Sequence, residues 1–337
     1  MDEPSNPHDK LFKETFSRVE FAAAELRSIL PPELSAQLDW STLELASSQD
    51  ERVGEGERSH DQLFQVQRRG HAGSAFIYVL FEHQRTSDPD MALRLLDYMV
   101  RIWRRARREV PRGSSLPPII PVVLSHAPGG WRAPTRFADL IGPSSASRSP
   151  FEPCTPDFTY LVDDLSKVDD HNLRARQLPT ELTVTLWAFR DGPRGGNAIL
   201  AGISAFAVEI EQVSSGPGGQ DAQWRIMGYL SISAGKRSPA PEALLTALSN
   251  AGPATQRAAM NNLEKFAEKH RRAGLEEGRE EGREGERRRV LRSLMHRTFG
   301  EVDPQLLARI DSLSPEELDE SLDRILTADS VEAILGE

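Results

Sequence analysis

The chain has 337 residues, a formal net charge of −10, 38% hydrophobic residues and a single cysteine, Cys154. One cysteine excludes a disulfide framework and a cysteine-based zinc site, and the acidic balance argues against nucleic-acid binding over the whole surface. The N-terminal sequence MDEPSNPHDK lacks the basic and apolar regions of a secretory signal, and no apolar run reaches the roughly 18 residues of a spanning helix. We therefore expect a cytoplasmic protein without a membrane partner.

The first part of the chain combines helical and strand patterns. Apolar residues at spacings of three and four predict one helix from His8 to Leu30, and two prolines follow it. A short connection then favours a strand at Thr42 to Leu45. Two strand-like runs follow, Asp61 to Gln67 and Ala75 to Phe81, with the glycines of a hairpin loop between them. The second run is continuously apolar, as a buried central strand would be.

Another helix and strand complete the pattern. Asp88 and Pro89 are typical of a helix start, the apolar residues of the next 15 positions share one helical face, and Pro111 ends the helix. Residues Ile119 to Leu124 predict a buried strand, in which Pro121 indicates an edge or a bulge. The order helix, strand, strand, helix, strand indicates an α/β domain.

The rest of the chain is predicted to be mainly helical. Residues 127–158 favour loop, Phe158 to Val162 a last strand, and 181–267 mostly helices. Glycines recur every four residues at 274, 278 and 282, which favours either a self-associating helix or a solvated charged one. Residues 314–317 (Ser-Pro-Glu-Glu) form a capping box.

We divide the chain into an α/β domain (1–165), a mainly helical region (166–270), a Gly/Glu/Arg-rich helical linker (271–289) and a small C-terminal helical domain (290–337). The C-terminal helical region is the candidate surface for homo-oligomer formation.

Acidic residues near two strand ends suggest a metal site. Glu82 and Gln84 share one face of a strand, whereas His83 points to the other. If the preceding strand pairs with this one, Asp61 lies at the same end, although a slip of one residue would turn either carboxylate away. Two carboxylates suit Mg²⁺, which takes hard oxygen ligands beside substrate phosphates. By spacing alone, this pattern also arises by chance in many sheets.

The context resembles a known family of nucleases. The segments are HDKLFKETFS (8–17), SHDQLFQV (59–66), FIYVLFEHQ (76–84), MALRLLDYMVRIW (91–103) and PPIIPVVLSHAPGGW (117–131). In this order they resemble the Rpn family of recombination-promoting nucleases, also described as YhgA-like putative transposases. The resemblance covers roughly residues 7 to 131, and the glycine-repeat tail is also similar.

The resemblance implies a PD-(D/E)xK nuclease-like core, a mixed sheet flanked by helices, in residues 1–165, followed by a mainly helical C-terminal region. It implies cleavage of DNA that depends on Mg²⁺. Asp61 matches the first acidic position and supplies a metal ligand together with Glu82. Gln84 stands where the general motif has lysine; it lacks a positive charge but can orient water or bind phosphate.

Further residues are candidates for DNA contact. Near the first helix start, His8, Asp9 and Lys13 either face the active site, as the resemblance suggests, or cap the helix and carry exposed charge. A first-helix carboxylate can also join such sites, and Glu14, Glu20 and Glu25 remain alternatives. Arg94 and Tyr98 can reach a phosphate, as can His126 at a strand end. Residues 101–112 contain six arginines, among them Arg101 and Arg105, and one glutamate. This basic segment forms either a DNA-binding face or a solvated surface.

Two functions compete at this stage. The first is a Mg²⁺-dependent DNA endonuclease related to recombination-promoting nucleases, with Asp61, Glu82 and Gln84 as its catalytic residues. The second is a catalytically weak or inactive module derived from a nuclease, which binds DNA or protein. The acidic pair favours the first, whereas Gln84 and the acidic net charge favour the second.

Overall fold

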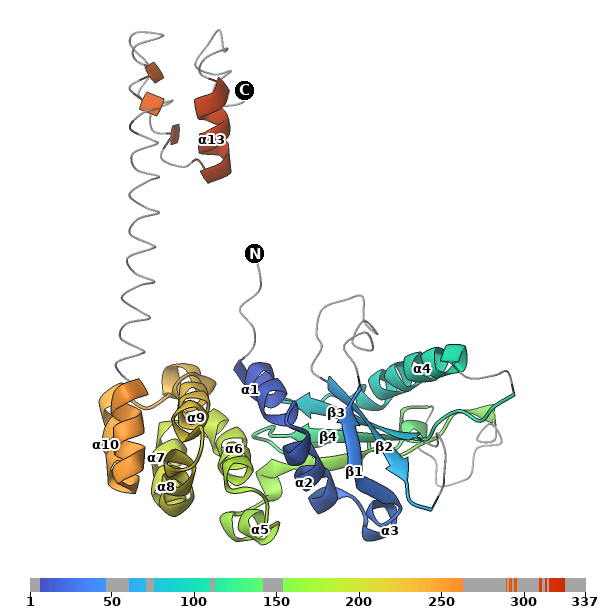
Figure 1. The fold of residues 1–337 in the computed structure, drawn as a ribbon. Coiled ribbons are helices and arrows are strands. Elements are labelled where there is room, and N and C mark those ends of the chain that lie inside the picture. Colours follow the sequence, from blue (N-terminus) through green and yellow to red (C-terminus); the bar gives the residue numbers. More distant parts are fainter. Residues whose placement is uncertain are drawn as a thin grey trace. The chain divides into compact units, whose positions relative to one another are not determined.

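The structure is a computed structural model (Figure 1), which describes residues 7–46, 61–70, 76–109, 113–141 and 154–262, and parts of 289–324. The chain divides into two compact units, Met1–Met260 and Asn261–Glu337. The first unit is mixed α/β and contains the sheet and most of the described helices.

A five-stranded sheet forms the centre of the first unit, in the order β1-β2-β3-β4-β5. Strands β1 (Leu38–Leu45), β2 (Asp61–Arg68) and β3 (Phe76–Gln84) are antiparallel neighbours, and β4 (Ile119–Ser125) and β5 (Leu161–Asp164) continue the sheet in parallel. The predicted hairpin and the predicted α/β class are therefore confirmed. Strand β3 runs three residues beyond the predicted Phe81, so it includes Glu82 and Gln84.

The predicted helix from His8 to Leu30 is wrong in one respect, because it is two helices. Helix α1 spans Pro7–Phe16 and α2 spans Val19–Ile29, and Arg18 between them has an extended backbone (φ −81°, ψ 103°). Arg18 is held there by ion pairs with Glu20 and with Glu181 of a later helix. Apolar spacing continues across the break, so the periodicity could not reveal it.

Helix α4 (Met91–Glu109) covers one face of the sheet, and α1 and α2 cover the other (Figure 1). The α4 face has a small apolar core around Met91, Leu95 and Val123. The predicted helix after Gln84 is confirmed, although Met91 is its first residue. Asp88 precedes it and accepts a hydrogen bond from the Asp90 N–H at 2.9 Å.

The prediction that Pro121 marks an edge holds locally, although β4 as a whole is an interior strand. Strand β4 lies between β3 and β5, and Pro121 pairs in register with Leu80 of β3. Pairing with β5 begins only at Val122, opposite Leu161. The residue without an N–H donor thus precedes the stretch of β4 that has a strand on both sides.

The described residues after the sheet are mainly helical, as the sequence predicts for this part of the chain. The helices include α5 (Asp170–Ala175), α6 (Thr180–Asp191), α7 (Gly196–Ala205), α8 (Ala207–Ser215), α9 (Gly219–Ser233) and α10 (Pro241–Ala251). Their buried side chains continue the core of α1, α2 and the sheet, so one apolar core crosses the proposed boundary at residue 165. Gly202 of α7 permits this packing, because a Cβ there would lie 2.1 Å from Nε1 of Trp187.

Two sequence predictions concern other parts of the chain. In the second unit, α13 (Pro315–Arg324) begins at the predicted proline, while Ser314 and the glycine repeat lie outside the described residues.

Among the described helices, none alone is long and apolar enough to cross a bilayer. The consecutive helices α7 and α8, bent by 73°, meet that test only together.

A buried ion cluster ties α2 to the far edge of the sheet. The Arg176 guanidinium, after α5, donates to Glu25 of α2 at 2.9 Å and to both carboxylate oxygens of Asp163 in β5. Glu25 is fully buried, and burial and the neighbouring Asp163 raise its pKa well above the usual value although Arg176 lowers it. One cation therefore serves two buried acidic groups.

Removal of this cation should destabilise the fold. We expect Arg176→Ala to lower the free energy of unfolding by about 3–5 kcal/mol, since it leaves buried acidic groups without compensation. As a control, Lys10→Ala removes an exposed ion pair with Glu14 and should cost less than about 0.5 kcal/mol. Urea unfolding measures both, and equal losses in the two variants would contradict the assignment.

Candidate functional site

Asp61 and Glu82 lie directly opposite each other in the β2–β3 ladder. The register runs without a shift from Asp61↔Glu82 to Gln67↔Phe76. Residues directly opposite in an antiparallel pair lie on the same face, with Cβ atoms about 4.5–5.5 Å apart. The register that the sequence left open thus brings the two acidic positions together.

The pleat determines which face carries this pair. On β3, the rings of Phe81 and His83 lie 5.2 and 4.8 Å from the ring of Phe12 in α1. On β2, Gln62 donates to the backbone carbonyl of Lys13, also in α1, at 3.2 Å. Since neighbouring residues of a strand alternate, Asp61, Glu82 and Gln84 belong to the other face, which α4 covers.

A row of polar residues crosses the ends of three strands beside this pair. Gln84 is in register with Ser125 of β4, which is in register with Asp164 of β5. Gln84 is 8% exposed and Ser125 is fully buried. Neither Ser125 nor Asp164 was predicted from the sequence; the available signal was that Ser125 ends an apolar strand and that two aspartates follow Leu161 and Val162.

Asp164, at one end of this row, makes several hydrogen bonds. Its carboxylate accepts hydrogen bonds from the Trp131 N–H and from Ser166, and it pairs with Lys167 at 3.0 Å. Burial opposes ionisation of Asp164, but the bonds from Ser166 and Trp131 and the charge of Lys167 outweigh it and lower the pKa. Asp164 therefore fixes the loop after β4 to the end of β5.

The α4 candidates for DNA contact differ in their environments. Arg94 pairs with Asp88 at 2.7 Å, and Arg101 pairs with Asp97 at 2.7 Å. Tyr98 is partly buried against the apolar core beneath α4, and Arg105 is half-buried. All of them lie on the helix that covers the face of Asp61 and Glu82.

The α1 residues lie on the opposite face of the sheet. His8 is buried and shares a hydrogen bond of 2.8 Å with the Tyr229 hydroxyl of α9. Asp9 Oδ1 lies 3.5 Å from His83 Nδ1, and Lys13 is exposed. His8 and Asp9 therefore pack behind strand β3, on the face opposite the one to which strand alternation assigns Asp61 and Glu82.

Alternative first-helix carboxylates also lie away from the α4 face. Glu14 and Glu20 are on the surface of α1 and α2, where they pair with Lys10 and Arg18. Glu25 is the buried partner of Arg176 described above. In the described geometry, none of the three joins Asp61 and Glu82.

His126 belongs to a buried stack of histidines. Its ring stacks on His83 at 4.8 Å, with His8 at 5.1 Å, and its side chain is 1% exposed. The His126 ring nitrogens have no hydrogen-bond partner among the described residues. The proposal of a DNA contact by His126 needs correction, because a ring inside the core offers no surface to a DNA strand. His83, which the sequence places on the face opposite Glu82 and Gln84, packs in the same stack.

Comparison with known proteins places the chain in a family. Residues 6–191, more than half of the chain, match the family described as "Putative transposase, YhgA-like". The chain belongs to this family. It is 32% identical over 168 residues to recombination-promoting nuclease RpnD of Escherichia coli O157:H7, and 34% identical over 125 residues to RpnC of E. coli K12.

The relatives of the YhgA-like family differ in how they are described. The match to RpnD covers 48% of this chain and 62% of the relative, and the match to RpnC covers 37% and 40%. A 36% identical match over 100 residues covers 29% of this chain and 93% of YjiP of E. coli K12, a "putative inactive recombination-promoting nuclease-like protein". No solved structure matches the chain. The strand β3 sequence and α4 lie inside the family match.

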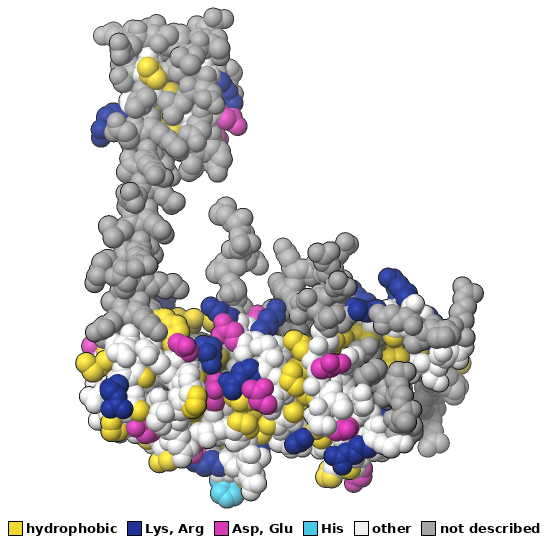
Figure 2. All heavy atoms as spheres, viewed as in Figure 1, with side chains coloured by type: hydrophobic (Ala, Val, Ile, Leu, Met, Phe, Trp, Pro, Cys, Tyr) yellow, Lys and Arg dark blue, Asp and Glu magenta, His cyan; other side chains and the backbone are white. Residues whose placement is uncertain are grey.

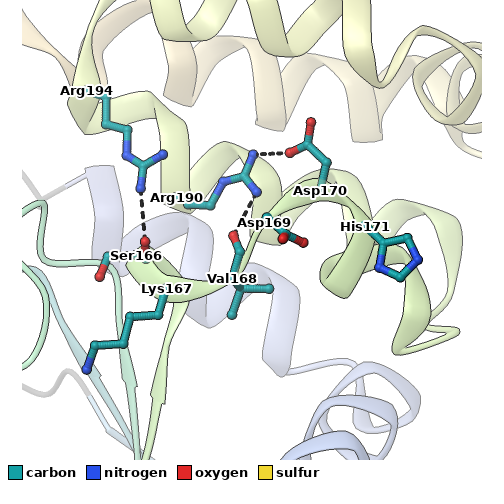
Figure 3. Close-up of a pocket in the computed structure, with 8 residues that line it drawn as sticks. All are labelled: Ser166, Lys167, Val168, Asp169, Asp170, His171, Arg190 and Arg194. Atoms are coloured by element: carbon teal, nitrogen blue, oxygen red, sulfur yellow. Dashed lines mark hydrogen bonds and ion pairs between the residues drawn. The ribbon is translucent and has the colours of Figure 1, made fainter.

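An open pocket of about 510 Å³ lies elsewhere in this YhgA-like chain, at the start of α5 and the end of α6 (Figure 3). Arg190 and Arg194 line it, but Arg190 bonds to Asp170 and the Val168 carbonyl, and Arg194 to Asp191 and the Ser166 carbonyl. Their charges are thus engaged within the protein. None of the residues singled out from the sequence lines this pocket.

The histidine stack should make the fold sensitive to acid. Burial, with the charges of His83 and Arg85, lowers the pKa of His8 to about 4, although Asp9 raises it. Burial, with His83 and His8, also lowers the pKa of His126 well below 6.5. Because the unfolded chain binds protons more readily, stability is fully present above about pH 6.5 and is lost as pH falls.

We therefore expect the melting temperature to fall as the pH is lowered from 7.5 to 5. By pH 4, protonation of His8 alone should reduce the free energy of unfolding by on the order of 3 kcal/mol. The His126→Phe variant keeps a ring in the stack but cannot be protonated, so its melting temperature should depend less on pH. Differential scanning calorimetry at several pH values tests this. A pH profile identical to that of the parent protein would rule out His126 as a contributor.

Proposed function

We propose that this protein is a Mg²⁺-dependent DNA endonuclease with a PD-(D/E)xK core. The observation that carries the proposal is the register of Asp61 opposite Glu82, at the end of the strand that also carries Gln84. Relatives named recombination-promoting nucleases support it, since the match to RpnD covers about half of this chain. The mixed sheet with helices on both faces is compatible with such a core.

The residues fit a magnesium site of limited protein ligation. Mg²⁺ takes one or two carboxylates and keeps several waters, which suits one aspartate and one glutamate on neighbouring strands. When bound, the ion would polarise the scissile phosphate and lower the pKa of a water molecule. Asp61 and Glu82 would hold it, and Gln84 would orient the water or hydrogen-bond the phosphate.

DNA contacts complete the proposal. Arg94, Tyr98, Arg101 and Arg105 lie on α4, the helix above the acidic pair, and are our candidates for phosphate contact. Lys13 is exposed on α1 at the other face of the sheet, so it would reach only a strand that passes around the edge.

A second candidate function is a DNA- or protein-binding module that has lost cleavage. Two observations favour it: Gln84 replaces the motif lysine, and one relative, YjiP, is described as putatively inactive. The two functions make opposite predictions for cleavage, although both allow binding.

Cleavage of supercoiled plasmid distinguishes the two functions. With Mg²⁺ we expect nicked or linear product, and we expect EDTA, Asp61→Ala or Glu82→Ala to reduce its rate at least about 100-fold by removing the metal ligands. Asp139→Ala, which removes an exposed carboxylate outside the strands, should cleave like the parent protein. Cleavage that persists in Asp61→Ala would indicate a contaminating nuclease, and no cleavage by the folded parent protein would favour the binding module.

Gln84 has its own test. If its amide helps to position water or phosphate, Gln84→Ala should lower the cleavage rate about 100-fold, as removal of one oriented hydrogen-bond donor commonly does. Gln84→Lys restores the residue of the general motif and should retain or raise the rate. Gln67→Ala, at an exposed position of β2, is the control. A Gln84→Ala rate equal to that of the parent would remove Gln84 from the mechanism.

A further inference from the structure

Helix α4 has a buried face and a basic outward face. Leu95, Met99 and Ile102 are buried against the sheet side. Arg104 and Arg108, one turn apart, are exposed on the opposite side of the helix, with Arg101 beside them. Figure 2 shows Lys and Arg side chains at the surface on the side where α4 lies in Figure 1.

The arginines of α4 differ in how far the protein already uses them. Arg101 pairs with Asp97, and Arg107 donates to the backbone carbonyl of Ser114 at 2.8 Å. Arg104 and Arg108 have no ion pair with any residue that the structure describes. The charges of Arg104 and Arg108 are therefore not neutralised by an ion pair with the described residues.

The direction of α4 places these two residues far from the acidic pair. Because α4 connects β3 to the parallel strand β4, it runs back along the sheet from the end at Gln84. Arg104 comes 13 residues after Met91, about 20 Å along the axis at 1.5 Å per residue. Arg108 comes 17 residues after Met91, about 26 Å along the axis. These two lengths correspond to about six to eight base pairs of duplex at 3.4 Å per step.

We propose that Arg104 and Arg108 contact the phosphate backbone of duplex DNA about six to eight base pairs from the end of the sheet that carries the acidic pair. Charge complementarity identifies the partner, since two uncommitted guanidinium groups on an otherwise acidic protein favour a polyanion at this face. A duplex is stiff over this length and can reach both ends of α4 at once. The location relative to the cut rests on the proposed nuclease function, whereas the contact itself does not.

Binding measured in EDTA tests the contact without cleavage. We compare Arg104→Gln/Arg108→Gln with a control, Lys236→Gln/Arg257→Gln, which removes two exposed positive charges elsewhere in the first unit. Glutamine has nearly the helix propensity of arginine, so α4 should persist, and the melting temperature checks this. The probe is a fluorescent 24-base-pair duplex, titrated between 50 and 200 mM NaCl and read by anisotropy.

The expected result is a change in the salt dependence of binding. Loss of two phosphate contacts should reduce the slope of log K against log salt by about 1.8, because each contact contributes about 0.9. We expect affinity to fall at least about tenfold in the Arg104/Arg108 variant and to stay within twofold in the control variant.

Several outcomes would overturn the proposal. They are an unchanged slope, an equal loss in the control variant, and a single strand of the same length binding more tightly than the duplex. The readouts also separate the two proposals. If the Arg104/Arg108 variant changes the salt slope but the parent protein never cleaves plasmid, the DNA contact stands and the nuclease proposal is refuted. If the parent protein cleaves plasmid but the variant leaves the salt slope unchanged, the nuclease proposal stands and the DNA contact is refuted.

Discussion

The register of the β2–β3 ladder is the constraint on which the candidate site depends. A slip of one residue would move every side chain of β2 to the other face of the sheet. Phe64 and Val66 of β2 and Phe81 of β3 are fully buried, so a slip would turn the side chains of Phe64 and Val66 out of the core that they share with α1 and α2. The packing of these apolar side chains therefore fixes the register that places Asp61 opposite Glu82.

The two faces of the sheet carry different kinds of residues at the end of strand β3. Behind β3, the rings of Phe12, His83 and His126 stack at 4.8 Å intervals and hold the end of the strand from the side of α1. In front, under α4, the same strand end carries Glu82 and Gln84. The alternation of side chains thus lets one short segment, Glu-His-Gln, place a packed ring on one face and polar residue types on the other. Rigid support of this kind is what a positioned metal site requires.

Arginine content alone does not identify a nucleic-acid surface in this protein. Arg176 compensates buried carboxylates, and Arg190 and Arg194 bond to aspartates and backbone carbonyls around the open pocket. Arg104 and Arg108 make no comparable ion pair with the described residues. The distinction matters because a charge already neutralised by the fold releases few counterions when DNA approaches.

The sequence by itself determined the hairpin, helix α4, the strand after it and the helical second half, because these depend on local apolar periodicity and on proline and glycine. It also indicated that Asp61 and Glu82 would lie at one end of the hairpin. Only the tertiary structure decided their register, the break at Arg18, the interior position of strand β4 and the burial of His126. Each of these depends on contacts between residues remote in the chain: the ion pair of Arg18 with Glu181, the strands on either side of β4, and the rings from α1 and β3 that enclose His126. A pattern read along the chain contains the preference of each segment but not the partner against which it packs.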